Sequence, residues 1–442
     1  MKLRREILRL AIPSILANIT VPLVGMVDMA VVGHLEGGFS SAALIGGITV
    51  GSMLFDLLYW NFSFLRTGTG GLTAQAFGRG DAPAQAHYLR RALRIALLSG
   101  LALIAIQWLV VQAAFLVVRC SPEVRQLASR YFYIRIWAAP ATLSLFAFKG
   151  WFIGMQDSVR PMAADLIING VNIVLSIVLG RIIGFAGVAI GTLVAQWSGF
   201  AYSALAVFHR YRFTFKHSSG PAPSLRDEHF FRLNRDLVIR SVGMLAVYIG
   251  FTVISARHGD VLLSSAAIMM KLLMLFSYFS DGFAYAGEAL TGRFTGEGSP
   301  EGVRSTVRGC FLWGGGFALV FFALYGLGGV PLLRLFTDDA DVLAASRQLL
   351  PWLMLMPVVG SPAFLWDGIF TGATRTADMR TSVVLCAIGF FFTYLALYWL
   401  LSPDDTGAIH LLMGAYFVHL VIRSLWLTVR WKKILIFDSK SY

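Results

Sequence analysis

Long runs of apolar residues, separated by short polar segments, follow one another from Ala11 to Arg430. A run of about 20 apolar residues is long enough to cross the hydrocarbon core of a bilayer as a helix. The pattern predicts twelve such helices, over residues 11–33, 44–74, 92–117, 128–153, 161–181, 186–208, 236–257, 262–290, 305–329, 343–370, 381–400 and 407–430. The expected fold is an all-α polytopic membrane protein.

Short matched segments indicate that the two halves of the chain are repeats. FIGMQDSVRPM begins at Phe152, and FTGATRTADMR begins 218 residues later, at Phe370. FGRG at Phe77 and TGEG at Thr295 are separated by the same 218 residues. Six spans is an even number, so the two repeats share one orientation in the membrane. The duplication predicts an N-lobe (1–208), a cytoplasmic linker (209–235) and a C-lobe (236–442) around a central cleft, which is typical of transporters.

Composition supports a membrane protein and gives it an orientation. Hydrophobic residues make up 57% of the chain and charged residues 14%, with a net charge of +13. The basic residues recur in short loops on one side, whereas the opposite loops HLEGG, FTDDAD and SPDDTG carry acids; Arg119, Arg125 and Arg130 are exceptions. This positive-inside pattern predicts that both termini are cytoplasmic. We expect the bilayer as a partner and no nucleic acid, because the basic residues recur in loops and do not cluster on one amphipathic element.

One carboxylate interrupts the first apolar run, VPLVGMVDMAVVGHLEGG, at Asp28. A charge in hydrocarbon costs at least ~2.5–3.5 kcal/mol, so an intramembrane acid usually has a function. At about 1.5 Å per residue, Asp28 lies roughly 9 Å from the outer end of its helix. On a second predicted helix, Asp165, Asn169, Asn172 and Ser176 form one polar stripe, in which Ser176 is level with Asp28 and Asn172 lies one turn deeper. On a third, Thr192 reaches the same depth and Gln196 lies a turn below it.

We therefore interpret Asp28 as a proton switch. Burial disfavours the ionised carboxylate, and hydrogen-bonding neighbours can hold either state. Pro13 and Pro22 leave backbone groups unpaired in the first helix and provide places where it can bend. The hypothesis is that proton uptake by Asp28 bends or repacks this helix and changes the substrate cavity. The alternative is a fixed ion pair with Lys271, since Arg66 comes out roughly 24 Å deeper than Asp28.

Other residues inside the predicted spans are less specific candidates for a function. A soft substrate-cavity wall is expected from flexible and aromatic side chains, with two amides nearby; the candidates are Met26, Met29, Met53, Phe55, Phe62, Asn169 and Gln196. The acids of the C-lobe are assigned structural or gating roles: Asp281, Glu288 and Asp367. Four basic residues suit anionic or amphipathic substrates, although snorkelling or pairing explains them equally well: Arg66, Arg135, Lys149 and Lys271.

Five segments carry a family resemblance: VPLVGMVDMAVVGHL, GLTAQAFGRGD, LNRDLVIRS, DGFAYAGEALTG and WDGIFTGATRTADMR. In them the chain resembles the DinF branch of the multidrug and toxic compound extrusion (MATE) transporters. The resemblance implies two six-helix lobes, a central cleft and export of organic compounds driven by inward flow of H+ or Na+. It implies that Asp28 is the coupling acid, Asn172 its neighbour, Pro13 the bending proline and Thr192 a looser match to a hydroxyl residue.

The chain departs from that family at Ser176, where many relatives have a second aspartate. This puts a two-carboxylate mechanism in doubt, and Asp165 is a weak substitute because it is near the cytoplasmic end. Na+ prefers several hard oxygen ligands, which Asp28, Asn172, Ser176 and Thr192 can supply. A proton needs only Asp28, so H+ is the favoured ion.

Absent motifs limit the rival functions. The sequence has no GxxxxGK[ST] phosphate loop for ATP, and neither HExxH nor GxSxG for a membrane-integral enzyme. Cys120, Cys310 and Cys386 are isolated, without metal-ligand spacing. The expected function is secondary active efflux by antiport with H+, or less favourably Na+, with no cofactor beyond that ion and no enzymatic activity. The first alternative is a flippase for lipid-linked or polyprenyl-phosphate precursors, and the second is a membrane-integral enzyme. With the family resemblance we also expect a monomer in a bacterial inner membrane, with small organic substrates as partners.

Overall fold

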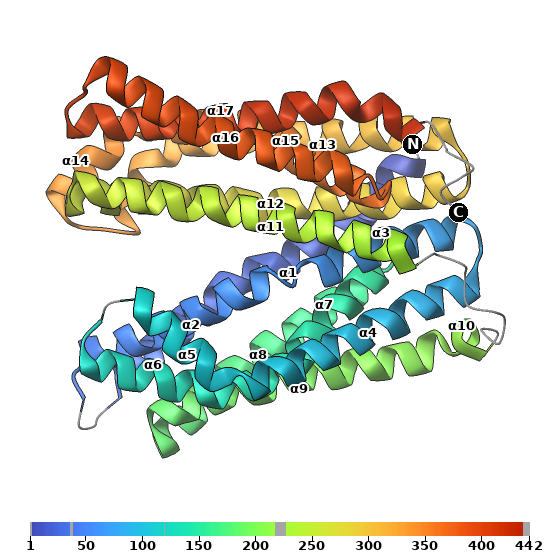
Figure 1. Cartoon of the computed structure of the whole chain (residues 1–442), viewed down its shortest axis with the longest axis horizontal. Coiled ribbons are helices and arrows are strands. Elements are labelled where there is room, and N and C mark those ends of the chain that lie inside the picture. The colour runs from blue at the N-terminus through green and yellow to red at the C-terminus, as the bar shows by residue number, and fades with distance from the viewer. Residues whose placement is uncertain (1, 36–38, 119, 217–226, 436–442) are drawn as a thin grey trace. The chain divides into compact units, whose positions relative to one another are not determined.

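The computed structural model describes residues 2–35, 39–118, 120–216 and 227–435, and all of their regular structure is helical (Figure 1). They divide into two compact units. The N-terminal unit is Leu16–Ser224, and the C-terminal unit combines Met1–Ile15 with Leu225–Tyr442. The predicted N-lobe began at residue 1, so the structure assigns the first residues differently. Residues 217–226 of the predicted linker, and Arg119, lie outside the described residues.

Helix α1 (Lys2–Gly33) contributes to both units and continues through Pro13 and Pro22. The other helices of the N-terminal unit follow in chain order: α2 (Ser41–Trp60), α3 (Phe64–Gly78), α4 (Ala82–Ala105), α5 (Gln107–Val117), α6 (Pro122–Arg135), η1 (Ile136–Ala138), α7 (Ala139–Gly154), α8 (Val159–Ile183), α9 (Phe185–Arg210) and α10 (Arg212–Lys216). Several begin at residues whose side chains cap the helix. Ser40 accepts from the amide of Ala43, and Asp81 accepts from that of Ala84.

The C-terminal unit contains the remaining helices: α11 (Asp227–Ser255), η2 (Ala256–His258), α12 (Asp260–Gly296), α13 (Pro300–Arg334), α14 (Ala340–Gln348), α15 (Leu350–Gly372), α16 (Thr376–Leu401), α17 (Asp405–Arg430) and η3 (Trp431–Leu435). Phe276, Tyr325 and Leu353 lie in its apolar core, which draws on α11, α12, α13, α15, α16 and α17. Tyr325 donates its hydroxyl proton to the carbonyl of Leu272, 2.6 Å away, which satisfies the buried phenol.

The described residues contain eleven helices long and apolar enough to cross a membrane, and twelve spans if a bent pair counts as one. The pair is Ala82–Ala105 with Gln107–Leu116, bent by 67°, where the sequence pattern predicted one span over 92–117. The prediction of a twelve-helix membrane fold is confirmed, and the break within its third span is new.

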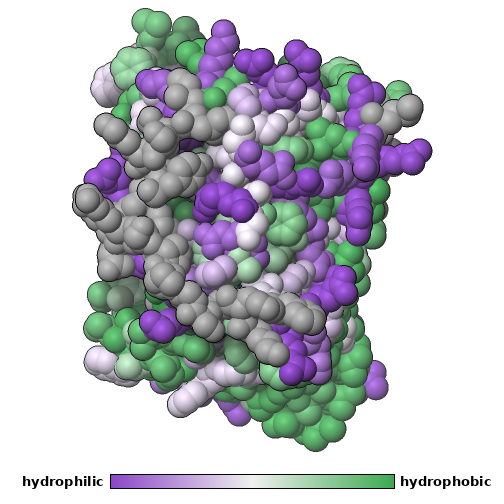
Figure 2. Space-filling model, turned by 90° about the vertical axis from the view of Figure 1, so that its right-hand side faces the viewer, coloured by the Kyte–Doolittle hydropathy of each residue, from purple (hydrophilic) through white to green (hydrophobic). Residues whose placement is uncertain are grey.

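Large apolar side chains stay exposed on these helices, as a lipid-facing surface requires. Leu116, Leu327 and Trp399 are 85%, 90% and 82% exposed. On the face that Figure 2 shows, hydrophilic side chains gather mainly over the middle, and hydrophobic ones lie mainly toward the edges. The surface therefore fits the membrane location inferred from the sequence.

Candidate functional site

Three helices of the N-terminal unit bring the predicted coupling residues together. Ser176 of α8 donates its hydroxyl proton to Oδ1 of Asp28 on α1, at 2.7 Å. One turn away, Asn172 donates through Nδ2 to Oγ1 of Thr192 on α9, at 2.9 Å. Thr192 in turn donates to the carbonyl of Val188, at 3.2 Å. The depth counts along separate helices therefore predicted residues that do meet.

Small residues allow these helices to approach closely. A Cβ on Gly187 of α9 would lie 2.1 Å from the carbonyl oxygen of Leu179, and one on Gly191 would lie 2.9 Å from the amide of Ser176. On α8, a Cβ on Gly180 would lie 2.8 Å from the side chain of Val31 on α1. Such contacts are typical of membrane helices packed through small residues. They set the spacing at which short Ser, Thr and Asn side chains can reach Asp28 and one another.

The predicted coupling residues are shielded from solvent. Asp28 is 7% exposed, and Ser176 is fully buried. Within the described part of its own unit, Asp28 forms no ion pair. Oδ1 of Asn172 is buried and has no hydrogen-bond partner among the described residues. The site is thus a buried acid held by a hydroxyl, beside an amide with an unused acceptor. A pair between Asp28 and Lys271, which belongs to the other unit, stays a prediction.

Arg135 of α6 is a neighbour that the sequence analysis did not connect with Asp28. Its charge acts electrostatically on Asp28. The guanidinium lies 4.6 Å from the ring centroid of Phe55 and donates to the hydroxyl of Tyr131 at 3.1 Å. Counting from residue 128 puts Arg135 about 10 Å deep, the layer of Asp28. The same depth argument, applied to cations, would have found it.

Comparison with known proteins gives the family. The family model described as MatE matches residues 13–178 and 237–399. The chain is 34% identical to "DNA damage-inducible protein F" of Escherichia coli over 96% of this chain and 91% of that protein. The chain belongs to the MatE family. Its members are transporters, so this chain is a transporter and not an enzyme.

Two further similarities agree with this family. A "Probable multidrug resistance protein NorM" of Thermotoga maritima is 21% identical over 78% of this chain and 75% of that protein. The fold matches the crystal structure titled "MATE in the bent conformation" with a TM-score of 0.86 at 17% identity. That match covers 99% of this chain and 98% of the other. The predicted family and fold are both confirmed.

Asp165, the suggested substitute for a second acid in this MatE-family chain, is engaged elsewhere. It forms an ion pair with Lys149 of α7, with Nζ and Oδ2 2.8 Å apart. Both side chains are about one-fifth exposed, 22% for Lys149 and 21% for Asp165. Pairing is one of the roles that the sequence left open for Lys149, and the geometry supports it.

The residues proposed for a substrate-cavity wall differ in their surroundings. Met26, Met29 and Met53 are exposed, whereas Phe55 is fully buried in the core, with its ring stacked 4.8 Å from that of Phe132. Phe55 therefore supports Arg135 and offers no open surface in this conformation.

The remaining candidates are half-buried. Asn169 donates to the hydroxyl of Thr20, and Gln196 accepts from that of Thr142. The ring of Phe62 lies 6.1 Å from that of Phe64.

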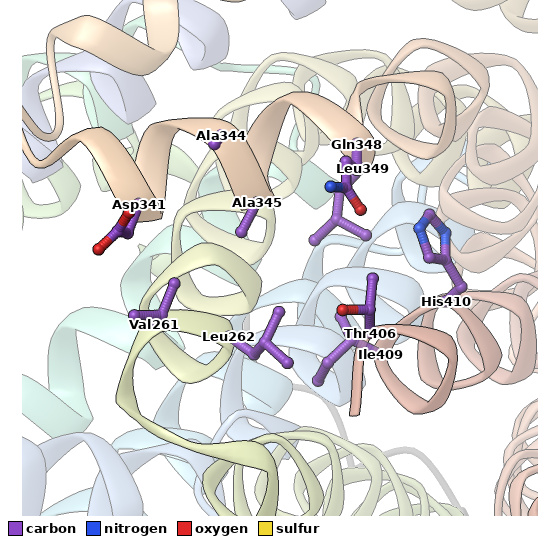
Figure 3. A pocket seen from close by; sticks show the side chains of 10 residues that line it. All are labelled: Val261, Leu262, Asp341, Ala344, Ala345, Gln348, Leu349, Thr406, Ile409 and His410. Carbon is purple, nitrogen blue, oxygen red and sulfur yellow. The ribbon is translucent and has the colours of Figure 1, made fainter. Parts of the chain in front are cut away.

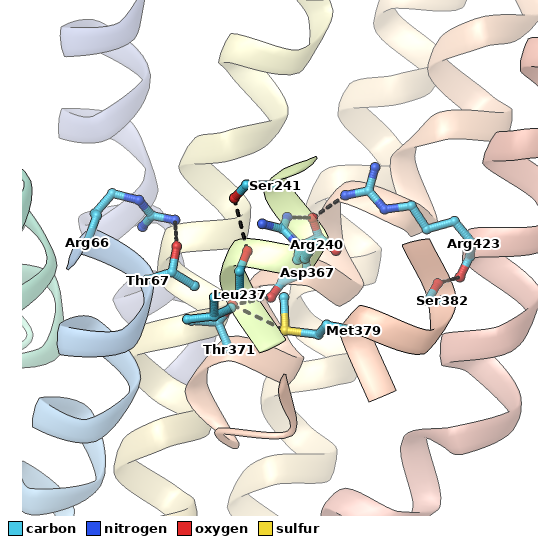
Figure 4. A network of polar contacts seen from close by, with 10 residues as sticks. All are labelled: Arg66, Thr67, Leu237, Arg240, Ser241, Asp367, Thr371, Met379, Ser382 and Arg423. Atoms are coloured by element: carbon cyan, nitrogen blue, oxygen red, sulfur yellow. Dashed lines mark hydrogen bonds and ion pairs between the residues drawn. The ribbon is translucent and has the colours of Figure 1, made fainter. Parts of the chain in front are cut away.

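Asp367 in the C-terminal unit has two partners that the sequence analysis did not name. Arg240 of α11 and Arg423 of α17 both donate to its Oδ2 (Figure 4). Each arginine lies within a predicted span, inside its two ends, and an intramembrane charge of this kind is the signal that would have identified it. Of the other acids assigned to this region, Glu288 on α12 is 1% exposed.

A pocket in the C-terminal unit has a lining that includes none of these residues. Asp341 and Gln348 of α14 line it together with Leu262 of α12 and His410 of α17 (Figure 3). None of the residues that the sequence singled out contributes to it. Its mixed lining lacks a buried charge, so we assign it no role in coupling.

Proposed function

We propose that this transporter exports small organic compounds, cationic or amphipathic, from a bacterial cell by exchange with H+. We place it in the cytoplasmic membrane as a monomer with both termini inside. The names of the NorM relatives support drug-like cargo, and the resemblance to the Escherichia coli protein supports the bacterial membrane. The proposed coupling residue is Asp28.

The hydrogen bond from Ser176 to Asp28 is the observation that carries this proposal. An ionised carboxylate accepts hydrogen bonds only, whereas a protonated one also offers an O–H donor. The buried Oδ1 of Asn172 is an acceptor without a partner among the described residues. Protonation of Asp28 would thus remove a buried charge and add the donor that this group of residues lacks.

Helix α1 is the element that such a change would move. Pro13 and Pro22 each leave a backbone carbonyl without its helical donor, which weakens α1 on both sides of the unit boundary between Ile15 and Leu16. We propose that proton uptake repacks α1 against α8 and that this repacking drives the transport cycle. Na+ is the alternative coupling ion, and the unused oxygen of Asn172 would be one of its ligands.

Transport by the purified protein in proteoliposomes tests the proposal. Vesicles carry an imposed pH gradient or an imposed Na+ gradient, and ethidium is the cargo. We expect the pH gradient alone to drive ethidium movement, and Asp28→Asn to abolish the coupled part. Asp165→Asn is the matched control, since it alters another carboxylate on a neighbouring span and should keep coupling. Full coupled transport by Asp28→Asn would refute the assignment, and transport driven only by Na+ would change the ion.

Flipping of lipid-linked phosphates is a second candidate, favoured by the buried Arg423 and the half-buried Arg240 of the C-terminal unit. A fluorescent polyprenyl phosphate in the same vesicles tests it directly. Movement of that lipid without movement of ethidium would replace drug export as the function.

A further inference from the structure

Two arginines share one carboxylate inside the C-terminal unit. Arg240 of α11 and Arg423 of α17 both donate to Oδ2 of Asp367 on α15 (Figure 4). The side chain of Arg423 is 2% exposed, and those of Arg240 and Asp367 are 17% and 15% exposed. Two positive charges and one negative charge leave a surplus of one positive charge. A surplus charge in apolar surroundings is costly unless a counter-ion compensates it.

The neighbouring ionisable groups do not supply that counter-ion. Asp236, one turn before Arg240 on α11, is already occupied by Arg380 at 2.6 Å and by Arg235 at 3.8 Å. Cys386 donates its S–H to the carbonyl of Val383 at 3.3 Å, so it is a neutral thiol. His419, one turn before Arg423, can only add positive charge. The surplus therefore remains uncompensated among the described residues of this cluster.

The two arginines also have unused donors. Nε of Arg240 and Nε of Arg423 are both buried, and neither has a hydrogen-bond partner among the described residues. Buried donors are normally satisfied, and guanidinium groups favour carboxylate and phosphate oxygens. The ring of Phe364 lies 5.7 Å from the guanidinium carbon of Arg423 and adds an apolar contact surface.

We propose that Arg240 and Arg423 form a subsite for an anionic group, a carboxylate or phosphate, on an amphipathic cargo. The partial exposure of Arg240 and Asp367 gives the anion a way to reach the cluster. Asp367 holds the two guanidinium groups together and limits the surplus charge to one. The subsite deepens the proposed transport function, because it names a chemical class of cargo, but it requires no particular coupling ion.

Equilibrium binding tests the subsite without any transport. The purified full-length protein in lipid nanodiscs is titrated with 2-naphthoate, with geranyl phosphate and with the cation 2-naphthylmethylammonium, and heats from empty nanodiscs are subtracted. We expect saturable binding of an anion and no dependence of cation binding on Arg240. Binding of naphthoate indicates an organic anion as cargo, and binding of geranyl phosphate alone indicates a lipid phosphate. Failure of both anions to bind overturns the proposal.

A charge series separates anion recognition from a purely structural ion pair. Arg240→Gln removes the surplus and should weaken anion binding by about tenfold or more, as expected for a lost charge-assisted hydrogen bond. Asp367→Asn adds to the surplus and should tighten binding. The double variant restores the surplus of one and should bind within about threefold of wild type.

Arg430→Gln is the matched control, because it removes another arginine of α17 from a separate ion pair, with Asp378 at 4.0 Å. It should leave anion affinity unchanged. Circular dichroism and thermal unfolding identify variants that fold. A folded Arg240→Gln protein with wild-type anion affinity, or weaker binding by a folded Asp367→Asn protein, would overturn the subsite. Neither outcome bears on Asp28, so the coupling proposal is judged separately.

Discussion

Ser176 of α8 donates a hydrogen bond to Asp28 of α1 across 2.7 Å, and both side chains are buried. The two residues are 148 positions apart in the chain. Their contact ties the helix that carries the acid to the helix that carries the polar stripe. A change in the protonation of Asp28 would therefore alter a hydrogen bond at the interface of α1 and α8.

Removal of the hydroxyl tests the importance of this contact. Ser176→Ala should slow proton-driven ethidium transport about tenfold or more, because one hydrogen bond to a charged group is worth about 1.5–3 kcal/mol. Ser176→Thr keeps the hydroxyl and should retain most of the rate. The measurement is the initial transport rate in proteoliposomes at equal protein content. Equal rates for the alanine and threonine variants would show that the hydroxyl is dispensable.

A substitution at the Asn172–Thr192 contact tests whether Thr192 only orients Asn172 or also takes part in coupling transport to the pH gradient. Thr192→Val keeps the shape of the side chain but removes the acceptor for Nδ2 of Asn172. We expect a loss of about 1 kcal/mol in the free energy of unfolding and a reduced rate that still depends on the pH gradient. Thermal unfolding and gradient-driven transport are measured on the same preparation. A Thr192→Val protein that moves cargo without regard to the gradient would place Thr192 in the coupling step itself.

Close packing of α8 and α9 predicts a sharp difference between two glycines. Gly187→Ala should destabilise the protein by at least 1–3 kcal/mol, about the cost of overpacking, because the new Cβ would lie 2.1 Å from the carbonyl oxygen of Leu179. Gly170→Ala on α8 is the control, since nothing lies within 4 Å of its Cβ position. Alanine is the better helix former, so this control should be neutral or stabilising. The check is the unfolding temperature of the two variants side by side, and similar values would contradict the packing.

The Lys149–Asp165 pair should matter little for transport. Each partner retains about one-fifth exposure, with 22% and 21%, so the pair is expected to contribute about 1 kcal/mol or less. Lys149→Gln should leave the pH dependence of transport unchanged and lower stability slightly. If this substitution shifts the pH dependence, Asp165 takes part in proton coupling after all, as the substitute for the acid that Ser176 replaces.

The sequence by itself determined the twelve spans, the family and the depth of the candidate residues. Span length and depth follow from hydrophobicity and from a fixed rise of about 1.5 Å per residue, which are local properties. This is why Asp28, Ser176 and Thr192 could be assigned to one layer before their contacts were known. The broken third span was missed because its apolar run continues through the bend near Ile106.

Only the tertiary structure decided which side chains in a layer face each other. Depth fixes a position along a helix axis, but contact also depends on how each helix is rotated and on which helices are neighbours. Phe55 was expected at a cavity wall, yet the packing of α2 against α6 buries it beside Phe132 and Arg135. Arg240 and Arg423 converge on Asp367 from helices 127 and 56 residues away, and no local pattern records such a meeting because the chain folds back on itself to make it.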